Sequence, residues 1–278
     1  MLALTSAKPD GSWCKKVRLN PLWDLSFACV LTLLICWYFA EKPSERGISR
    51  IRQFFFYLAM FLAFVVLVGP IPHLAVKTFS IHMVQHVALM MLISPLIVLG
   101  SPIRIAHDSR FPIVRRVVRG TGQNLVIRQL FRPEVGFAIF LATLISTHFS
   151  PLADAGMRNP NVHVLELIMF LVGGFIYYYP VLEGNPKPFM VAYPVRVLSL
   201  FAMMLPETMT GFFLYSGNKL LHAVPMDMSN MNGLSDQHTG GAIMWAMGML
   251  IDATWIGSAA YDWFANEKAL SEVGEASD

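Results

Sequence analysis

Charged residues are scarce in this chain of 278 residues, since Asp, Glu, Lys and Arg together make up only 14% of it. An average soluble domain carries about 25% charged residues. Hydrophobic residues reach 55%, and the mean hydropathy is +0.53. This composition excludes an ordinary soluble globular protein, and nothing in the chain supports nucleic-acid binding.

Cysteine is also scarce. The three cysteines, Cys14, Cys29 and Cys36, form no Cys-x-x-Cys pair, so we expect buried thiols rather than a disulfide framework. The first twenty residues are polar and basic and lack an apolar stretch, which argues against a cleavable signal peptide.

Catalytic motifs are missing as well. The sequence contains no recognisable nucleophile–base pair and no phosphate-binding loop. This argues against hydrolysis and ATP-driven pumping, and we do not expect the protein to be an enzyme.

Apolar runs close to the roughly 20 residues that cross a bilayer recur along the whole chain. Because helices satisfy their own backbone hydrogen bonds in lipid, these runs predict membrane-spanning helices. The predicted spans are Leu22–Ala40, Phe54–Gly69, Ile81–Leu99, Val135–Phe149, Val162–Leu182, Val195–Tyr215 and Gly240–Tyr261. We therefore expect an all-α integral membrane protein, a bundle of seven transmembrane helices at 22–262. A polar N-terminal segment at 1–21 precedes it, and an acidic cytoplasmic tail at 263–278 follows.

Arginines predict the orientation of this bundle. Seven of them lie between spans three and four, from Arg104 to Arg132, and the loop after span one is also basic. Positively charged loops stay cytoplasmic, so we expect the N-terminus outside and the C-terminus in the cytoplasm. Apolar residues alternate with these arginines in a way that suits a short interfacial helix, which Pro112 would interrupt. A solvated basic loop is the simplest interpretation, and docking of anionic lipid or a partner is the alternative.

Seven of the eight histidines fall on the predicted outer side, and only His107 lies on the cytoplasmic side. His82 and His86 are four residues apart and share a helix face, as His163 and Glu166 do at a spacing of three. At ~1.5 Å rise per residue, all four lie in the outer ~10 Å of their spans. Polar groups within a bilayer are costly and usually functional.

His148, at the outer tip of span four, belongs to the same layer. A single interfacial histidine is more often a hydrogen-bonded surface residue than a ligand. The combination nevertheless predicts a shared metal or haem site. Glu166 would be a direct ligand or would accept a hydrogen bond that fixes the tautomer of an imidazole.

The predicted outer loop between spans six and seven is rich in soft ligands. It contains His222, Met226, Met228 and Met231, and His238 follows it. Thioethers and imidazoles together suit Cu(I), although a methionine-rich loop without a ligand role is an equal alternative. Other methionines are expected to fill gaps in the core, among them Met83, Met244, Met247 and Met249.

Two acidic residues are predicted inside the membrane. Glu207 lies in the outer half of span six, where it could join the outer site or relay protons. Asp252 lies deeper, in span seven, and we expect it to pair with another polar group.

Several motifs, taken together, resemble the CtaG-type multi-span cytochrome c oxidase assembly factors. They occur in the order of that family and cover about residues 75–245. The motifs are His82-Met-Val-Gln-His86, Ser94-Pro95 running to Gly100-Ser-Pro102, Thr147-His148 with Pro151-Leu152-Ala-Asp154, His163-Val-Leu-Glu166, and Asp236-Gln237 with Gly240-Gly241.

The resemblance implies a multi-pass protein of the bacterial plasma membrane that helps a haem–copper oxidase mature, by supplying copper. Its partners would be an oxidase subunit or a copper chaperone, within the lipid bilayer, and a homo-oligomer is possible. Carried over by motif, the candidate site residues are His82, His86, His148, Asp154, His163, Glu166 and Asp236. The chain departs from the family at Leu167, where a second histidine is common, and at His238, where glutamine is common.

From the residue pattern and from the family resemblance, we expect a copper site at the outer face. Cu(I) would be collected by the Met/His loop and passed to the histidine layer. Three other functions stay open: a haem b electron carrier with two axial histidines, a copper or proton-coupled transporter, and a scaffold in which the histidines only stabilise helix ends.

Overall fold

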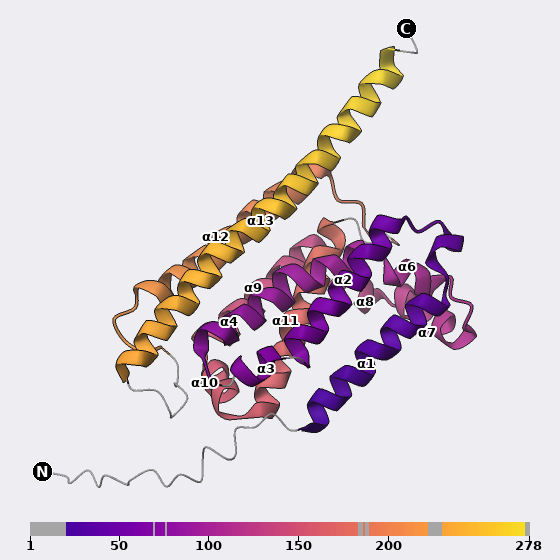
Figure 1. Cartoon of the computed structure of the whole chain (residues 1–278). Helices are drawn as coiled ribbons and strands as arrows, with labels where there is room; N and C mark the ends of the chain where they lie inside the picture. Colours follow the sequence, from indigo (N-terminus) through magenta and orange to yellow (C-terminus); the bar gives the residue numbers. More distant parts are fainter. Residues whose placement is uncertain are drawn as a thin grey trace, which may run out of the picture.

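The computed structural model describes residues 21–68, 70–75, 77–182, 186, 189–221 and 230–275. Within these ranges every regular element is helical (Figure 1). The elements are α1 Pro21–Ala40, η2 Pro43–Arg46, α2 Arg50–Leu67, α3 Pro70–Ala75, α4 Phe79–Val87, η3 Ala88–Ile93, α5 Ser94–Leu99, α6 Pro102–His107, α7 Pro112–Gln123, α8 Leu125–Leu130, α9 Pro133–Phe149, α10 Pro151–Arg158, α11 Pro160–Val181, α12 Tyr193–Ser216 and α13 Asn230–Glu275.

Six helical segments of the described chain are long and apolar enough to cross a membrane, or seven if one bent pair counts as a span. The bent pair is α9 with α10, whose axes differ by 66°. Ser150 separates them in an extended conformation, and its side chain caps α10 at Leu152. The all-helical membrane fold is confirmed, with six to seven candidate spans where seven were predicted.

The helices form one bundle in which α11 lies centrally, packed against α9, α10, α5 and η3 (Figure 1). The long helices α12 and α13 form a hairpin along one side, and α13 also packs on α4. Helix α1 begins at one end of the bundle and α13 ends beyond the other (Figure 1).

Prolines start many of these helices, because proline lacks an N–H that the first turn would leave unpaired anyway. Pro112 is one of them. The sequence pattern suggested that it would interrupt an interfacial helix, but it stands in the first turn of α7. Helix α7 has no buried residue and lies on the outside of the bundle.

Helix α13 runs without a break from Asn230 to Glu275, 46 residues in all. The expected boundary between membrane domain and acidic tail, at residue 262, is therefore not a boundary of secondary structure. The charged residues after it continue the same helix away from the bundle (Figure 1).

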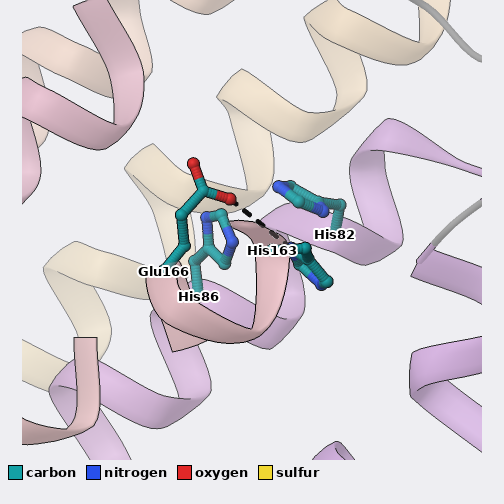
Figure 2. Close-up of side chains that lie close together, drawn as sticks. All are labelled: His82, His86, His163 and Glu166. Atoms are coloured by element: carbon teal, nitrogen blue, oxygen red, sulfur yellow. Dashed lines mark ion pairs between the residues drawn. The ribbon is translucent and has the colours of Figure 1, made fainter. Parts of the chain in front are cut away.

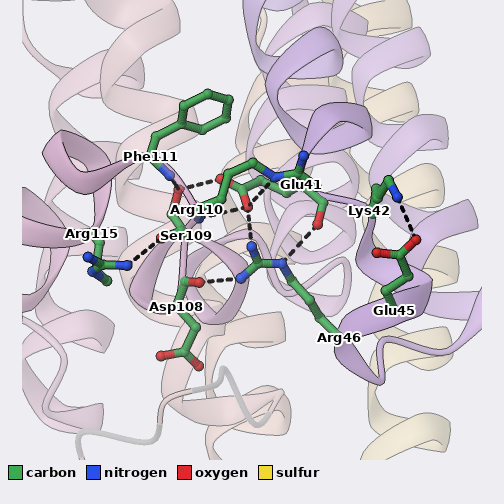
Figure 3. Close-up of polar contacts among 9 residues, drawn as sticks. All are labelled: Glu41, Lys42, Glu45, Arg46, Asp108, Ser109, Arg110, Phe111 and Arg115. Atoms are coloured by element: carbon green, nitrogen blue, oxygen red, sulfur yellow. Dashed lines mark hydrogen bonds and ion pairs between the residues drawn. The ribbon is translucent and has the colours of Figure 1, made fainter.

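Glu41 ties the end of α1 to the segment between α6 and α7 (Figure 3). Its side chain is fully buried and lies 2.6 Å from Nη2 of Arg46. It also accepts hydrogen bonds from the hydroxyl of Ser109 and, at 3.1 Å, from the backbone N–H of Arg110. The arginine-rich segment is thus anchored to the bundle at its start rather than being a free basic loop.

Small residues let α12 and α13 approach closely, as is common in membrane bundles. A Cβ at Gly241 would overlap the backbone N–H of Tyr215 and lie 2.7 Å from the carbonyl oxygen of Gly211. The same hairpin holds Gly240 against the ring of Phe79 on α4. The position of α13 against α4 therefore depends on these glycines.

Gly241→Ala is expected to destabilise the protein by about 1–3 kcal/mol, because the added methyl meets backbone atoms that cannot rotate away. Thermal unfolding in detergent would measure the effect. Gly257→Ala, on the same helix with nothing within 4 Å of the new methyl, is the matched control and should be neutral or slightly stabilising. Equal melting temperatures for the two variants would contradict the packing described here.

Candidate metal centre

Four predicted site residues converge in the structure: His82 and His86 from α4, and His163 and Glu166 from α11 (Figure 2). Each offers one ligand atom, and these atoms all lie within 4.8 Å of one another. All four side chains are buried, with exposed fractions of 5% or less. The predicted convergence of these two helix pairs is confirmed.

Helical spacing places these side chains. His82 and His86 stand one turn apart on α4, with ring centroids 4.1 Å apart. The His163 ring stacks on that of His82 at 4.6 Å. Phe170, two turns along α11 from His163, closes the inner side with its ring 4.2 Å from that of His86. The imidazole of His86 thus lies against an apolar ring.

Gln85 fixes the tautomer of His163. The Nε2 amide of Gln85 donates to the carbonyl oxygen of Val66 at 2.8 Å, which can only accept. Its Oε1 must therefore accept from Nε2 of His163, 3.0 Å away. The neutral His163 ring then carries its hydrogen on Nε2, and Nδ1 holds a lone pair.

This lone pair faces the carboxyl group of Glu166. Nδ1 of His163 lies 3.5 Å from Oε2 of Glu166, and among the described residues neither atom has a hydrogen-bond partner. Two buried acceptors that face each other are unfavourable unless a cation lies between them. A proton or a metal ion satisfies that need, and with His82 and His86 beside them the arrangement favours a metal.

Gly156 on α10 makes room for the Glu166 carboxylate. A Cβ at this position would overlap Oε2 and lie 2.6 Å from Oε1. Helix α10 packs on α11, so a side chain at position 156 would compete with this carboxylate for the same space. This contact could not be predicted from the sequence, where Gly156 is marked only by lying two residues after Asp154.

The donor set of three imidazoles and one carboxylate suits borderline metals such as copper and zinc. It is not a magnesium or calcium site, since those ions prefer oxygen ligands. These four buried side chains are therefore candidate ligands for one transition-metal ion.

Gln85→Leu is expected to weaken metal binding about 10- to 100-fold, because the residue that orients a ligating imidazole is removed. Anaerobic Cu(I) titration of the purified protein against a competing chelator would measure the affinity. The matched control is Gln129→Leu, at an exposed position of α8. Equal affinities for the variant and the wild type would contradict a role of Gln85 in orienting a metal ligand.

His148 lies beside the four-residue group rather than within it. Its ring centroid is 6.0 Å from that of His86. Nδ1 of His148 lies 2.8 Å from the carbonyl oxygen of Leu144, which places the ring hydrogen on Nδ1. Asp154 is half-buried on α10 and also stands outside the group.

Asp236 caps a helix, a role that the ligand prediction did not anticipate. Its carboxylate accepts from the backbone N–H groups of Phe79 at 2.6 Å and Ser80 at 3.2 Å, in the first turn of α4. A negative charge at that end of a helix is stabilising. Asp236 thereby sets the position of the helix that carries His82 and His86.

Gln237 and His238 close the end of the α12–α13 hairpin. Gln237 is buried and accepts from the backbone N–H of Leu221 at 2.8 Å. Nε2 of His238 lies 2.8 Å from the carbonyl oxygen of Gly217. The predicted ligand His238 is thus engaged at the hairpin, outside the four-residue group.

The predicted loop ligands His222, Met226 and Met228 lie outside the described residues. The backbone of Met231 belongs to the first turn of α13, while its side chain is not among those described. The proposal of a Met/His collecting loop therefore stays a prediction.

His107, predicted on the opposite side from the other histidines, lies in α6 with 41% of its side chain exposed. Nδ1 of His107 lies 2.8 Å from Oδ1 of Asp108. This hydrogen bond, with a second from Arg119, lowers the pKa of Asp108 below its ordinary value. His107 therefore belongs to a surface ion-pair group.

A family model described as cytochrome c oxidase caa3 assembly factor matches residues 32–266 of the chain. The match includes all four residues of the centre, together with α2 to α12 and most of α13.

Uncharacterized proteins of Mycobacterium bovis and Mycobacterium tuberculosis are each 32% identical over 180 residues, 61% of this chain. An uncharacterized protein of Mycobacterium leprae is 31% identical over 179 residues. The chain covers 27% of the length of these relatives, so they are much longer proteins. No solved structure matches the chain.

Proposed function

The chain belongs to the cytochrome c oxidase caa3 assembly factor family, and we propose that it carries copper for the assembly of a haem–copper oxidase. The carrier site is the centre of His82, His86, His163 and Glu166. One observation supports this most directly: the lone pair of His163 faces the Glu166 carboxylate at 3.5 Å in a buried place. A coordinated cation resolves that arrangement.

Charge balance favours Cu(I) over divalent ions. The three imidazoles are neutral as ligands, so the centre contributes only the one negative charge of Glu166. Cu(I) makes the whole group neutral, whereas Zn²⁺ or Cu²⁺ leaves a net positive charge in a site whose ligands are 5% exposed or less. Net charge buried within a bilayer is costly.

The centre lies at the outer face of the bacterial plasma membrane in this proposal. The span that begins at Phe79 carries His82 in its first turn, and its other end leads into α6 and the arginine-rich α7 and α8. Positively charged segments stay cytoplasmic. His82 and its partners therefore face the outer side, where copper would be exchanged with an oxidase subunit or a copper chaperone.

The haem alternative is less well supported by the geometry. The cavity beside His86 and His148 is about 10 Å³, at the lower limit for one water and far too small for a porphyrin. Carrying a copper ion does not require a cavity large enough for a porphyrin.

Complementation of a bacterial strain that lacks its own family member would test the function. The wild-type chain should restore oxidase activity and the copper content of the purified oxidase. Glu166→Gln, which keeps the shape but removes the charge, should lower both at least tenfold at equal membrane abundance. Glu134→Gln, at an exposed position in the first turn of α9, is the control.

Normal oxidase copper in the Glu166→Gln strain would refute a carrier role for this centre. Normal oxidase copper is the result expected if the protein acts only as a scaffold, provided that the Glu166→Gln variant is present in the membrane.

A further inference from the structure

A second group of potential ligands lies next to the metal centre. A small cavity there is bordered by four methionines, two histidines and a glutamate, besides three apolar residues. Its lining is Met83, His86, Val87, Met90, Met91, Leu144, His148, Phe170, Glu207 and Met244. His86 belongs both to this thioether cavity and to the metal centre.

The methionines come from two parts of the chain that are far apart in the sequence. Met83, Met90 and Met91 lie on α4 and η3, and Met244 lies on α13, all with exposed fractions of 4% or less. Met83 and Met244 were expected to be core packing, and they are buried as expected. The structure adds that their side chains border the same small space.

A π-helical segment, η3, holds Met90 and Met91 in place. Pro95 has no N–H to give to the carbonyl oxygen of Met91 four residues earlier, so the regular helix is broken there. The indole N–H of Trp255 on α13 donates to that oxygen instead, at 2.8 Å. Segments of this kind occur often at functional sites.

Glu207 places a carboxyl group at the edge of this apolar space. Its side chain is 3% exposed, and among the described residues neither carboxylate oxygen has a hydrogen-bond partner. Asp252 of α13, 2% exposed, lies against it across the α12–α13 interface. Two carboxyl groups in contact do not both ionise easily, so a monovalent cation beside them would be balanced by a single carboxylate.

We propose that the thioether cavity is a second Cu(I) site, with methionine sulfurs as ligands and Glu207 as the balancing anion. Thioethers select soft monovalent ions and bind them without losing a proton. Neutral sulfurs alone would leave a buried cation uncompensated, which explains why a carboxylate stands among them. His86 then links the two sites, so an ion can pass between them by exchange of one ligand at a time.

The second site rests on the proposed copper-carrier function, and binding stoichiometry separates the two claims. Purified full-length protein would be dialysed anaerobically against Cu(I), and bound copper would be counted per chain. We expect two ions for the wild type. Met90→Leu/Met244→Leu, which conserves volume but removes two sulfurs, should retain one.

Control methionines are available on the same helix. Met247→Leu/Met249→Leu changes two exposed positions of α13 and should still bind two ions. Glu207→Gln should weaken one of the two sites at least tenfold. X-ray absorption should show sulfur neighbours of copper in the wild type and fewer in the Met90→Leu/Met244→Leu variant.

Removing ligands of the metal centre should change copper binding in a different way. His82→Ala/His163→Ala leaves the cavity lining intact, so it should retain one ion that has sulfur neighbours. One ion in the wild type, unaffected by the methionine changes, would overturn the second site and leave the carrier proposal standing. Two ions unaffected by the histidine changes would overturn the histidine centre instead. No bound ion at all would overturn both.

Discussion

Replacing His82 and His163 with alanine is expected to remove one Cu(I) from the protein and to abolish its support of oxidase maturation. These residues come from two helices, and their ligand atoms lie within 4.8 Å of each other, close enough for both to bind one ion. With two of four ligands gone, the Cu(I) affinity of the centre should fall by several orders of magnitude. Copper bound per chain and oxidase activity in a complemented strain are the two measurements.

The matched control is His107→Ala. This histidine lies in α6, outside the centre, and contacts Asp108. It should leave both copper binding and oxidase activity unchanged. If the His82→Ala/His163→Ala variant matured the oxidase as well as the control did, the histidines would serve only to stabilise the fold.

Gly156→Ala is expected to have the second largest effect, although Gly156 carries no ligand atom. The new methyl would occupy the place of the Glu166 carboxylate, which must then rotate away from His163. We expect Cu(I) affinity at the centre to fall at least tenfold while the fold persists, since the displaced group is the end of a side chain rather than backbone. Chelator competition would measure the affinity, and circular dichroism would verify the fold.

Gly122→Ala provides the comparison for that variant. It adds the same methyl to a helix where nothing lies within 4 Å. Its copper affinity should equal that of the wild type. Equal affinities for Gly156→Ala and Gly122→Ala would mean that Glu166 is not a ligand.

The helix pairs of the centre could be predicted from the sequence because they obey local geometry. A spacing of four puts His82 and His86 on one face, and a spacing of three does so for His163 and Glu166. Their shared depth in the membrane followed from the position of each pair within its apolar run. The structure confirms that these two pairs meet.

The residues that tune the centre could not be predicted in this way. Gln85 orients His163 and Gly156 admits Glu166, but both act through tertiary contacts between elements far apart in the chain. No spacing rule relates them to their partners. The only signal for Gln85 was its place within the His82–His86 motif.

Two of the predicted site residues contact backbone atoms and lie outside the four-residue group. Asp236 caps α4 and His238 contacts the hairpin backbone, so proximity in a motif did not make them members of the four-residue group.

Met247 and Met249 were expected in the core but are exposed, with exposed fractions of 47% and 42%. In a membrane protein the apolar surface faces lipid, so hydrophobicity alone does not distinguish core from surface.

The most direct test of a copper centre is metal analysis of the purified protein after anaerobic Cu(I) loading, with an absorption spectrum of the same sample. We expect bound copper in whole-number stoichiometry, one ion of which is lost in the His82→Ala/His163→Ala variant, and no Soret band. Protein without copper after loading, or with a Soret band in place of copper, would contradict it.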